Sequence, residues 1–179
     1  MSTKRHIQNI ALIGFMGTGK SSVGQLVAQQ LHFTFLDTDH VIEARTNKSI
    51  SEIFAQDGEP AFRELERKIV AELALRKKTV ISTGGGLPVN PDNLASLKSH
   101  SLIVCLWASA EKIWDRVHNQ SHRPLLNEPD PLAKIKKLLE QREPFYRQAD
   151  VLLNTEMRAL KDVAQQVIHQ YHLAHAAHR

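Results

Sequence analysis

Residues 14–21 read Gly14-Phe15-Met16-Gly17-Thr18-Gly19-Lys20-Ser21 and match the pattern G-x-x-x-x-G-K-[ST] at every fixed position. Glycines at this spacing let the backbone fold around an anion, so that its N–H groups and the N-terminus of the next helix converge on phosphate oxygens. Lys20 is then placed to reach the outer phosphates, and Ser21 to bind a magnesium ion.

The context of this loop fits the same motif. A short apolar run at 10–13 precedes it, and a helical pattern begins at Ser22, which is the strand, loop and helix order that the motif requires. The alternative is a glycine-rich turn followed by a chance Lys-Ser pair. We expect a nucleoside triphosphate as the first ligand.

Length and charge place the chain in a broad class. Its 179 residues suit one domain with a proper core. The net charge of +4 is compatible with nucleic-acid binding, but the basic residues are scattered among acidic ones, and a small anionic ligand explains the excess equally well. Aromatic residues make up only 6% of the chain, which disfavours the stacking surface of a nucleic-acid-binding ATPase or regulatory module.

The single cysteine, Cys105, lies inside the apolar run at 102–107. No intrachain disulfide can form, and a buried thiol in a reducing cytoplasm is expected. No apolar segment approaches the ~18 residues needed to cross a membrane. We therefore expect a soluble cytoplasmic protein. We also expect a monomer that contacts neither membranes nor nucleic acid.

Short apolar runs alternate with longer helical patterns, which predicts an α/β fold with a parallel sheet and helices on both faces. The expected strands are 7–13, 33–37, 79–82, 102–107 and 151–154. A capping box at 49–52, a stop at Gly58 and an apolar stripe at 62, 65, 69 and 73 predict a short helix followed by a long one. Asn90-Pro91 and Asp130-Pro131 mark two more helix starts, and Pro144 should end or kink the second of these helices.

Residues 118–129 are polar, punctuated by proline and without periodicity. Loops of about a dozen residues inside a compact domain are usually functional lids or else disordered. Because this loop carries Arg123 in a chain that already binds phosphates, we favour a lid.

Two carboxylates, Asp37 and Asp39, follow the second expected strand at the edge of the sheet where ligands bind. One can act on magnesium through water and the other on an acceptor hydroxyl. The alternative is that they form a turn that caps the helix beginning near His40. One carboxylate can also cap this helix while the other takes part in chemistry.

The third strand ends in Gly84-Gly85-Gly86, which permits close backbone approach to a ligand, or else forms a flexible turn. Arg142 lies on the apolar face of its helix, so its charge should meet an anion in a cleft or a protein carboxylate in a salt bridge. Arg63 alone would be an ordinary surface arginine, although its planar fork suits a substrate carboxylate.

Six segments, in order along almost the whole chain, together resemble the shikimate kinase family. They are 14–24, Phe35-Leu36-Asp37-Thr38-Asp39, Ile53-Phe54 through Gly58-Glu59 to Phe62-Arg63, Gly84-Gly85-Gly86, Arg123-Pro124-Leu125-Leu126, and Arg142 before Pro144-Phe145-Tyr146.

The resemblance implies transfer of the γ-phosphoryl group of ATP to the 3-hydroxyl of shikimate, on the route to chorismate and the aromatic amino acids. It also implies a nucleoside-monophosphate-kinase type of P-loop fold with three α/β/α layers and a five-stranded parallel sheet in the order 2-3-1-4-5. The expected single domain, 1–179, includes a substrate-binding segment at about 38–65 and a lid at about 118–129.

Individual roles also follow from the resemblance. Those expected to be catalytic are Lys20, Asp39 and Arg123. The implied ATP-binding residues are Gly17, Thr18, Gly19, Lys20, Ser21, Ser22, Arg116 near the adenine and Arg123 on the phosphates. One Mg²⁺ ion would bind Ser21 directly and Asp37 through water. The implied shikimate-binding residues are Asp39, Arg63, Gly84, Gly85, Gly86 and Arg142, with Asp39 orienting or deprotonating the attacking hydroxyl.

Two points stay open. A gluconate kinase or nucleotide kinase of the same fold is the nearest alternative, and the acceptor residues are what favour shikimate over it. His169, His172, His175 and His178 recur at every third position near the C-terminus. They form a metal-binding helix face or, as we expect, a fraying polar tail without a function.

Overall fold

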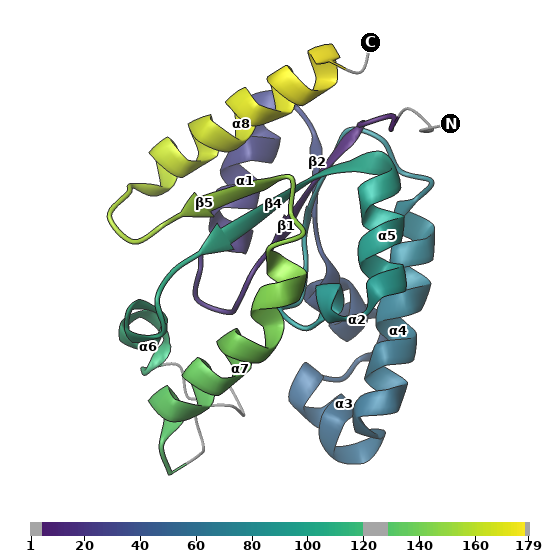
Figure 1. Cartoon of the computed structure of the whole chain (residues 1–179). Helices are drawn as coiled ribbons and strands as arrows, with labels where there is room; N and C mark the ends of the chain where they lie inside the picture. Colours follow the sequence, from purple (N-terminus) through teal and green to yellow (C-terminus); the bar gives the residue numbers. More distant parts are fainter. Residues whose placement is uncertain (1–4, 120–128, 178–179) are drawn as a thin grey trace.

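The computed structural model describes residues 5–119 and 129–177. Its centre is one parallel sheet of five strands in the order β2-β3-β1-β4-β5, as predicted (Figure 1). The strands are β1 (Asn9–Ile13), β2 (Thr34–Asp37), β3 (Thr79–Ser82), β4 (Ser101–Trp107) and β5 (Val151–Asn154). Each begins within two residues of its expected start.

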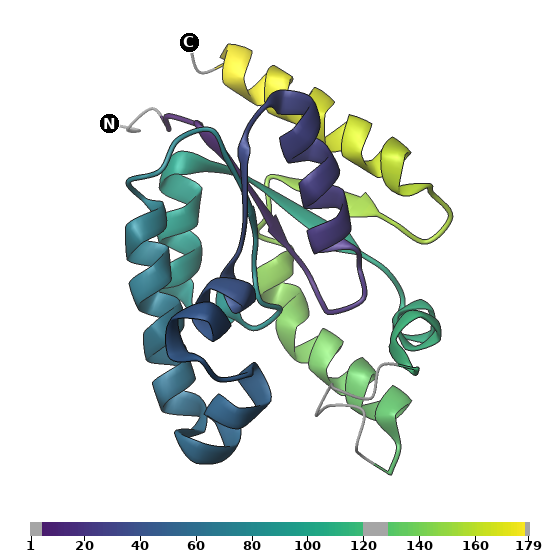
Figure 2. The ribbon, with the colours of Figure 1, turned by 180° about the vertical axis from the view of Figure 1, so that it is seen from behind.

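Helices cover both faces of this sheet. The described helices are α1 (Lys20–Leu31), α2 (Thr38–Thr46), α3 (Ile50–Gln56), α4 (Gly58–Leu73), α5 (Pro91–His100), α6 (Ala110–Val117), α7 (Pro131–Tyr146) and α8 (Leu160–Ala177), with a 3₁₀ turn η1 (Leu87–Val89). α1 and α8 pack together on one face, while α4, α5 and α7 lie on the other (Figures 1 and 2). The three α/β/α layers are therefore confirmed.

Strand β1 separates two hydrophobic cores, because alternate side chains of a strand point to opposite faces. Ile10 and Leu12 belong to the core beneath α1 and α8. Ala11 and Ile13 belong to the core that α2–α5 and α7 cover. All five residues of β1 are buried, as expected for the central strand of a covered parallel sheet.

The residues predicted to cap helices are found at the starts of the observed helices. Ser49 and Glu52 form a reciprocal capping box at the start of α3. Asn90 accepts bonds from the first turn of α5, and Asp130 from that of α7. On α4 the predicted stripe packs into the core, with Phe62, Ile69 and Leu73 buried.

The predicted stop at Gly58 is confirmed, because α3 ends at Gln56 with Asp57 as its C-cap, and Gly58 follows with a left-handed φ of 83° where α4 begins. Two other local expectations need correction. α7 runs two residues past Pro144, to Tyr146. The C-terminal histidines are not in a fraying tail as far as Ala177, since α8 is continuous there and His175 contacts the Ile7 carbonyl. His178 lies outside the described residues.

Within 5–119 and 129–177, no group of three or more His, Cys, Asp or Glu side chains is placed to hold a metal ion, on α8 or elsewhere. In the same ranges, no helix combines the length and the apolar character needed to cross a membrane. Cys105 is buried and unpaired by any disulfide. Burial raises the pKa of its thiol to about 12, which fits the expected core cysteine.

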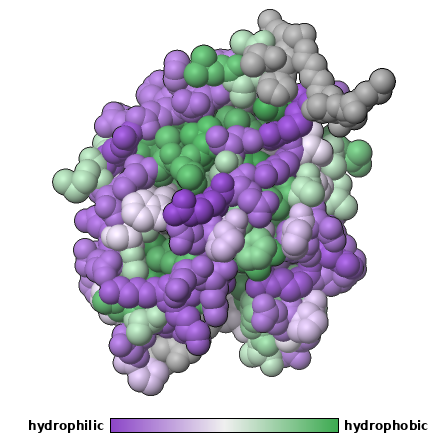
Figure 3. All heavy atoms as spheres, viewed as in Figure 1, coloured by the Kyte–Doolittle hydropathy of each residue, from purple (hydrophilic) through white to green (hydrophobic). Residues whose placement is uncertain are grey.

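A hollow of about 690 Å³ is lined by residues of β4, β5, α6 and α7. Exposed Trp107 and Leu152 border it, and hydrophobic side chains gather among hydrophilic ones on the face that Figure 3 shows. Its lining includes Tyr146 but no residue of the phosphate loop or of the 84–86 glycine segment. The hollow is therefore distinct from the candidate active site.

Candidate active site

The phosphate loop connects β1 to α1 at the C-terminal edge of the sheet. Gly14, Gly17 and Gly19 have positive φ values of 135°, 74° and 94°, which glycine adopts without the steric cost of other residues. A Cβ at Gly14 would lie 2.3 Å from the Leu106 carbonyl oxygen. The buried Thr18 donates from Oγ1 to the Phe15 carbonyl at 2.8 Å and closes the loop on itself.

Helix α1 begins directly after this loop without a side-chain cap. Gly19 occupies the cap position and makes no side-chain hydrogen bond to the first turn. Such a helix start presents backbone N–H donors and the positive end of the helix dipole, which together suit an anion. The exposed Ser22 lies in the first turn of α1, as an ATP-binding role requires.

Lys20 lies across the inside of the loop. Its side chain is almost entirely buried, and Nζ donates to the carbonyls of Gly14 at 2.9 Å and Phe15 at 2.8 Å. Its positive charge is close enough to lower the pKa of Asp39. Lys20 therefore connects the phosphate loop electrostatically with the expected acceptor residues.

Asp37 uses its two carboxylate oxygens for different purposes. Oδ1 accepts from the backbone N–H of Asp39 at 3.1 Å and of His40 at 3.4 Å, and so caps α2. Oδ2 accepts from the Ser21 hydroxyl at 2.7 Å. Asp37 thus caps α2 with one oxygen and meets Ser21 with the other.

Asp39 is the most perturbed carboxylate in the site. Its Oδ1 is buried and has no hydrogen-bond partner in the part of the chain that the structure describes. Burial, together with the charges of Asp37 and Glu43, raises the pKa of Asp39 to about 6, although Lys20 and Arg63 oppose the shift. A carboxylate in this state is suited to accept a proton near neutral pH.

The glycine segment Gly84-Gly85-Gly86 lies between the two arginines of the acceptor set. A Cβ on Gly85 would lie 3.3 Å from Nη1 of Arg142, and one on Gly86 would lie 2.8 Å from Nη1 of Arg63. The Gly84 N–H donates to the Thr38 hydroxyl at 3.0 Å. A side chain at Gly84 or Gly86 would therefore displace Asp39 or Arg63, and one at Gly85 would press against Arg142.

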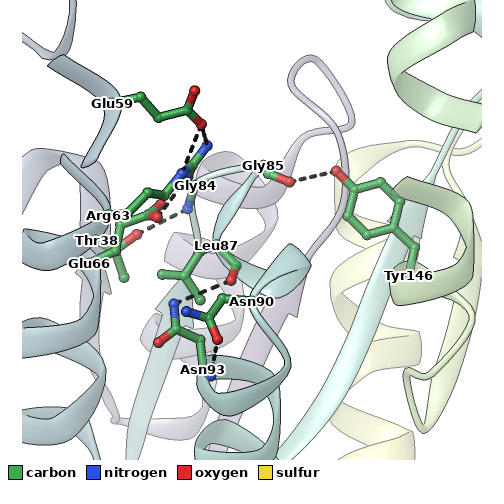
Figure 4. Close-up of polar contacts among 10 residues, drawn as sticks. All are labelled: Thr38, Glu59, Arg63, Glu66, Gly84, Gly85, Leu87, Asn90, Asn93 and Tyr146. Atoms are coloured by element: carbon green, nitrogen blue, oxygen red, sulfur yellow. Dashed lines mark hydrogen bonds and ion pairs between the residues drawn. The ribbon is translucent and has the colours of Figure 1, made fainter. Parts of the chain in front are cut away.

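Arg63 is not an ordinary surface arginine. Nη1 donates to the buried carboxylate of Glu66 at 2.7 Å, while Nε and Nη2 donate to Glu59 Oε1 at 3.2 and 2.9 Å (Figure 4). Burial disfavours the charged guanidinium, but both glutamates outweigh it and raise the pKa of Arg63. The guanidinium also lies over the Phe62 ring, 5.4 Å from the ring centroid.

Arg142 makes no ion pair with a described residue, so the salt-bridge alternative finds no partner there. Its guanidinium lies over the Phe15 ring at 5.3 Å. The neighbouring Tyr146 hydroxyl donates to the Gly85 carbonyl at 2.7 Å (Figure 4). Arg142 therefore lies beside both the phosphate loop and the glycine segment, as an anion-binding role requires.

Arg116 and Arg123 are the two arginines expected to bind the nucleotide. Arg116 donates to the Gly17 carbonyl at 3.0 Å and to the Thr155 carbonyl at 2.7 Å, which ties the phosphate loop to the segment after β5. Its expected place near the adenine stays a prediction. Arg123, with most of the expected lid, lies outside the described residues.

Similarity to known proteins decides the family. The shikimate kinase family pattern matches residues 16–172. A curated shikimate kinase from Thermodesulfovibrio yellowstonii is 44% identical over 165 residues, which cover 92% of this chain and 95% of that protein. The chain belongs to the shikimate kinase family. It is accordingly an ATP-dependent phosphotransferase of the shikimate pathway, as the sequence predicted.

Solved structures separate this kinase from its nearest alternative. The shikimate kinase of Acinetobacter baumannii, solved in complex with shikimate, has a TM-score of 0.87 and 38% identity, covering 92% of both chains. A gluconokinase from Sinorhizobium meliloti has a TM-score of 0.63 and 18% identity. The second likeness shows the fold alone, so the shikimate kinase assignment is favoured over gluconate kinase.

Two residues near the substrate side of this kinase were missed from the sequence. Glu66 is fully buried and holds Arg63, and Tyr146 positions Gly85. A signal existed for Glu66, because it lies on the α4 face that buries Phe62 and Ile69, where an acidic residue needs a cationic partner. Tyr146 belongs to the segment after Arg142 that carries the family resemblance, but the sequence assigned it no role of its own.

Substitution of Gly84 with Ala should disable the kinase. A Cβ at this position would lie 2.5 Å from Asp39 Oδ1, so the carboxylate must move away. A displacement of about 1 Å costs about 10²-fold in kcat, and the overpacking costs about 1–3 kcal/mol of stability. Steady-state kinetics and thermal unfolding test this, and a kcat close to wild type would show that the Asp39 carboxylate can move without loss.

Proposed function

We propose that the two halves of this site carry out direct phosphoryl transfer from ATP to the 3-hydroxyl of shikimate. Lys20, Ser21 and Asp37 form the donor half. The acceptor half consists of Asp39, Gly84, Gly85, Gly86, Arg63 and Arg142. The main support is the buried, unpartnered Oδ1 of Asp39, which lies next to the glycine segment and within the field of Lys20.

In the donor half, the loop N–H groups, the start of α1 and Lys20 bind the phosphates of ATP. Ser21 and Asp37 would hold one Mg²⁺ ion, and the donor set fits, because a hydroxyl and a carboxylate oxygen 2.7 Å apart are hard ligands of the kind that Mg²⁺ prefers. When bound, the ion neutralises charge on the phosphate oxygens. Ser21 would contact it directly and Asp37 through water.

In the acceptor half, the carboxylate of shikimate binds between Arg63 and Arg142. The glycine segment separates these guanidinium groups, and backbone atoms of Gly85 would contact the ring substituents. The relative from A. baumannii binds shikimate, and the same ligand class suits a site that combines two cations with a buried carboxylate.

Asp39 is the proton acceptor in this proposal, or at least orients the attacking hydroxyl. The 3-hydroxyl oxygen forms a bond to the γ-phosphorus, the bond from that phosphorus to the β,γ-bridging oxygen breaks, and the hydroxyl proton passes to Asp39. No covalent enzyme intermediate is needed, since positioning and charge neutralisation account for most catalysis of this kind.

Two further parts of the proposal rest on sequence alone. Arg123 would close on the phosphates from the lid at about 118–129, which excludes water and so prevents hydrolysis of ATP. The protein would act as a cytoplasmic monomer, without nucleic acid or membrane, as the scattered charge and the low aromatic content of the sequence favour.

A coupled assay of ADP release by the purified protein tests the acceptor. We expect release with shikimate, and little with gluconate or nucleoside monophosphates. Release at the same rate whether or not shikimate is present would contradict the proposal.

Substitution of Arg142 with Ala should raise the KM for shikimate about 10- to 100-fold, because a charge-assisted hydrogen bond contributes about 1.5–3 kcal/mol. The KM for ATP should change little. Arg147, directly after the same helix, pairs with Glu143 and is largely exposed, so Arg147→Ala serves as the control with both KM values unchanged. Equal losses for both substrates in Arg142→Ala would indicate that Arg142 supports the fold instead.

A further inference from the structure

Arg63 has two carboxylate partners on its own helix, and they differ in exposure. Glu66 is fully buried, whereas the side chain of Glu59 is 62% exposed. The two lie on different sides of the guanidinium in Figure 4. Arg63 is therefore held by one carboxylate inside the protein and covered by another at its surface.

Glu66 cannot leave this arrangement. Its Oε1 is buried without a hydrogen-bond partner in the described part of the chain, and burial raises the pKa of its carboxyl group despite Arg63. Loss of the ion pair would leave a buried charge uncompensated, which is strongly unfavourable. Glu66 is thus a permanent counterion of Arg63.

Glu59 can leave. It is four residues before Arg63 in the first turn of α4, and such exposed helical pairs are weak because water solvates both groups when they separate. A single oxygen of Glu59 accepts both hydrogen bonds. Release of Glu59 therefore exposes two guanidinium donors at little cost.

The donors that Glu59 occupies are those that a ligand carboxylate would use. Nε and Nη2 form one edge of the planar guanidinium, and such an edge matches the two oxygens of a carboxylate. Stacking on Phe62 and the bond to Glu66 limit the freedom of the guanidinium to turn a different edge toward a ligand. Two glutamates also balance the two arginines, so an incoming anion meets no formal excess of positive charge.

We propose that Glu59 is a built-in competitor for the carboxylate of the acceptor: it occupies the Nε and Nη2 edge of Arg63 and yields it when the acceptor binds. The proposal rests on the acceptor role proposed for Arg63. Glu59 then determines specificity through Arg63, because a ligand must gain enough from Arg142, Asp39 and the glycine segment to displace it. Simple anions such as sulfate lack those contacts and are kept out.

Replacing Glu59 with Gln tests this competition. We expect the KM for shikimate to fall about 2- to 5-fold, as an exposed ion pair of ordinary strength allows, with kcat not increased and the KM for ATP unchanged. Sulfate should become a stronger competitive inhibitor against shikimate. Glu66→Gln should act in the opposite direction and raise the KM for shikimate, because it removes the fixed partner.

The same helix offers a matched control. Glu64 pairs with Arg67 at the surface of α4, so Glu64→Gln removes one charge of the same kind near the same place and should leave both KM values and sulfate inhibition unchanged. Thermal unfolding shows whether each variant folds. A KM for shikimate that is unchanged or raised in Glu59→Gln would overturn the proposed competition.

Arg63→Ala separates this idea from the proposed function. If that variant keeps the wild-type KM for shikimate, Arg63 does not bind the acceptor, and the acceptor assignment itself is wrong. If its KM rises while Glu59→Gln has no effect, the acceptor assignment holds and only the competition by Glu59 fails.

Discussion

Replacement of Asp39 with Asn is expected to lower kcat about 10²- to 10⁴-fold, the usual contribution of a general base. Asparagine keeps the size of the side chain but cannot take a proton from the acceptor hydroxyl. In the wild-type enzyme, kcat/KM for shikimate should rise with pH through about 6, because the raised pKa of Asp39 leaves the carboxyl group partly protonated below that value. The rise should be absent from the residual activity of Asp39→Asn.

The same substitution should stabilise the protein. The folded pKa of Asp39, about 6, is above its unfolded value, so the folded state holds the proton more tightly and loses stability as pH rises from about 4 to 6. At pH 7 an amide avoids the cost of the buried, unpartnered charge. After allowance for partial solvent exposure, we expect a gain of about 1–2 kcal/mol, measured by denaturant unfolding.

The change in kcat and the change in stability together distinguish a catalytic role of Asp39 from a structural one. A loss of kcat with a loss of stability would show that Asp39 supports the fold, not the reaction. A nearly unchanged kcat would reduce Asp39 to an orienting acceptor, which is the other role left open for it.

Replacement of Lys20 with Met is expected to lower kcat/KM for ATP about 10³-fold, because one fixed cation at the transferring phosphoryl group is removed. Methionine preserves much of the buried stem, so the fold should persist. It leaves the carbonyls of Gly14 and Phe15 without the Nζ donor. Lys20→Arg, which keeps the charge, should retain more activity than Lys20→Met.

The two predictions are coupled through the field of Lys20. Since Lys20 lowers the pKa of Asp39, Lys20→Met should move that pKa above its wild-type value. Carbon-detected NMR titration of the Asp39 carboxyl group measures this without any need for activity. An unchanged pKa would show that Lys20 and Asp39 are electrostatically independent.

Local sequence was sufficient for most of the architecture. The strands and helix starts depend on short-range features, such as the apolar run at 10–13, the capping box at Ser49 and the Asn90-Pro91 pair, and these act in the structure as predicted. The end of α7 lies two residues beyond Pro144, because packing of the whole helix outweighs the preference of a single residue at the end of an element.

The phosphate loop could be identified completely from the sequence, because its chemistry lies in consecutive backbone groups whose geometry depends on glycine. The acceptor side could be anticipated only as a set of separate residues. Two features of the site depend on how strands and helices pack together. Asp37 divides its oxygens between the cap of α2 and Ser21, and Oδ1 of Asp39 has no partner among the described residues.

The amino-acid sequence was therefore enough for the donor loop, the order of elements and the family of the kinase. The tertiary structure was needed to show which charges compensate one another, namely Glu66 and Glu59 on Arg63 and Lys20 near Asp39, and that the Tyr146 hydroxyl bonds to the Gly85 carbonyl. The reason is physical. Hydrogen-bonding and helix preferences act over a few residues, whereas burial and Coulomb interactions depend on distances that only the folded chain defines.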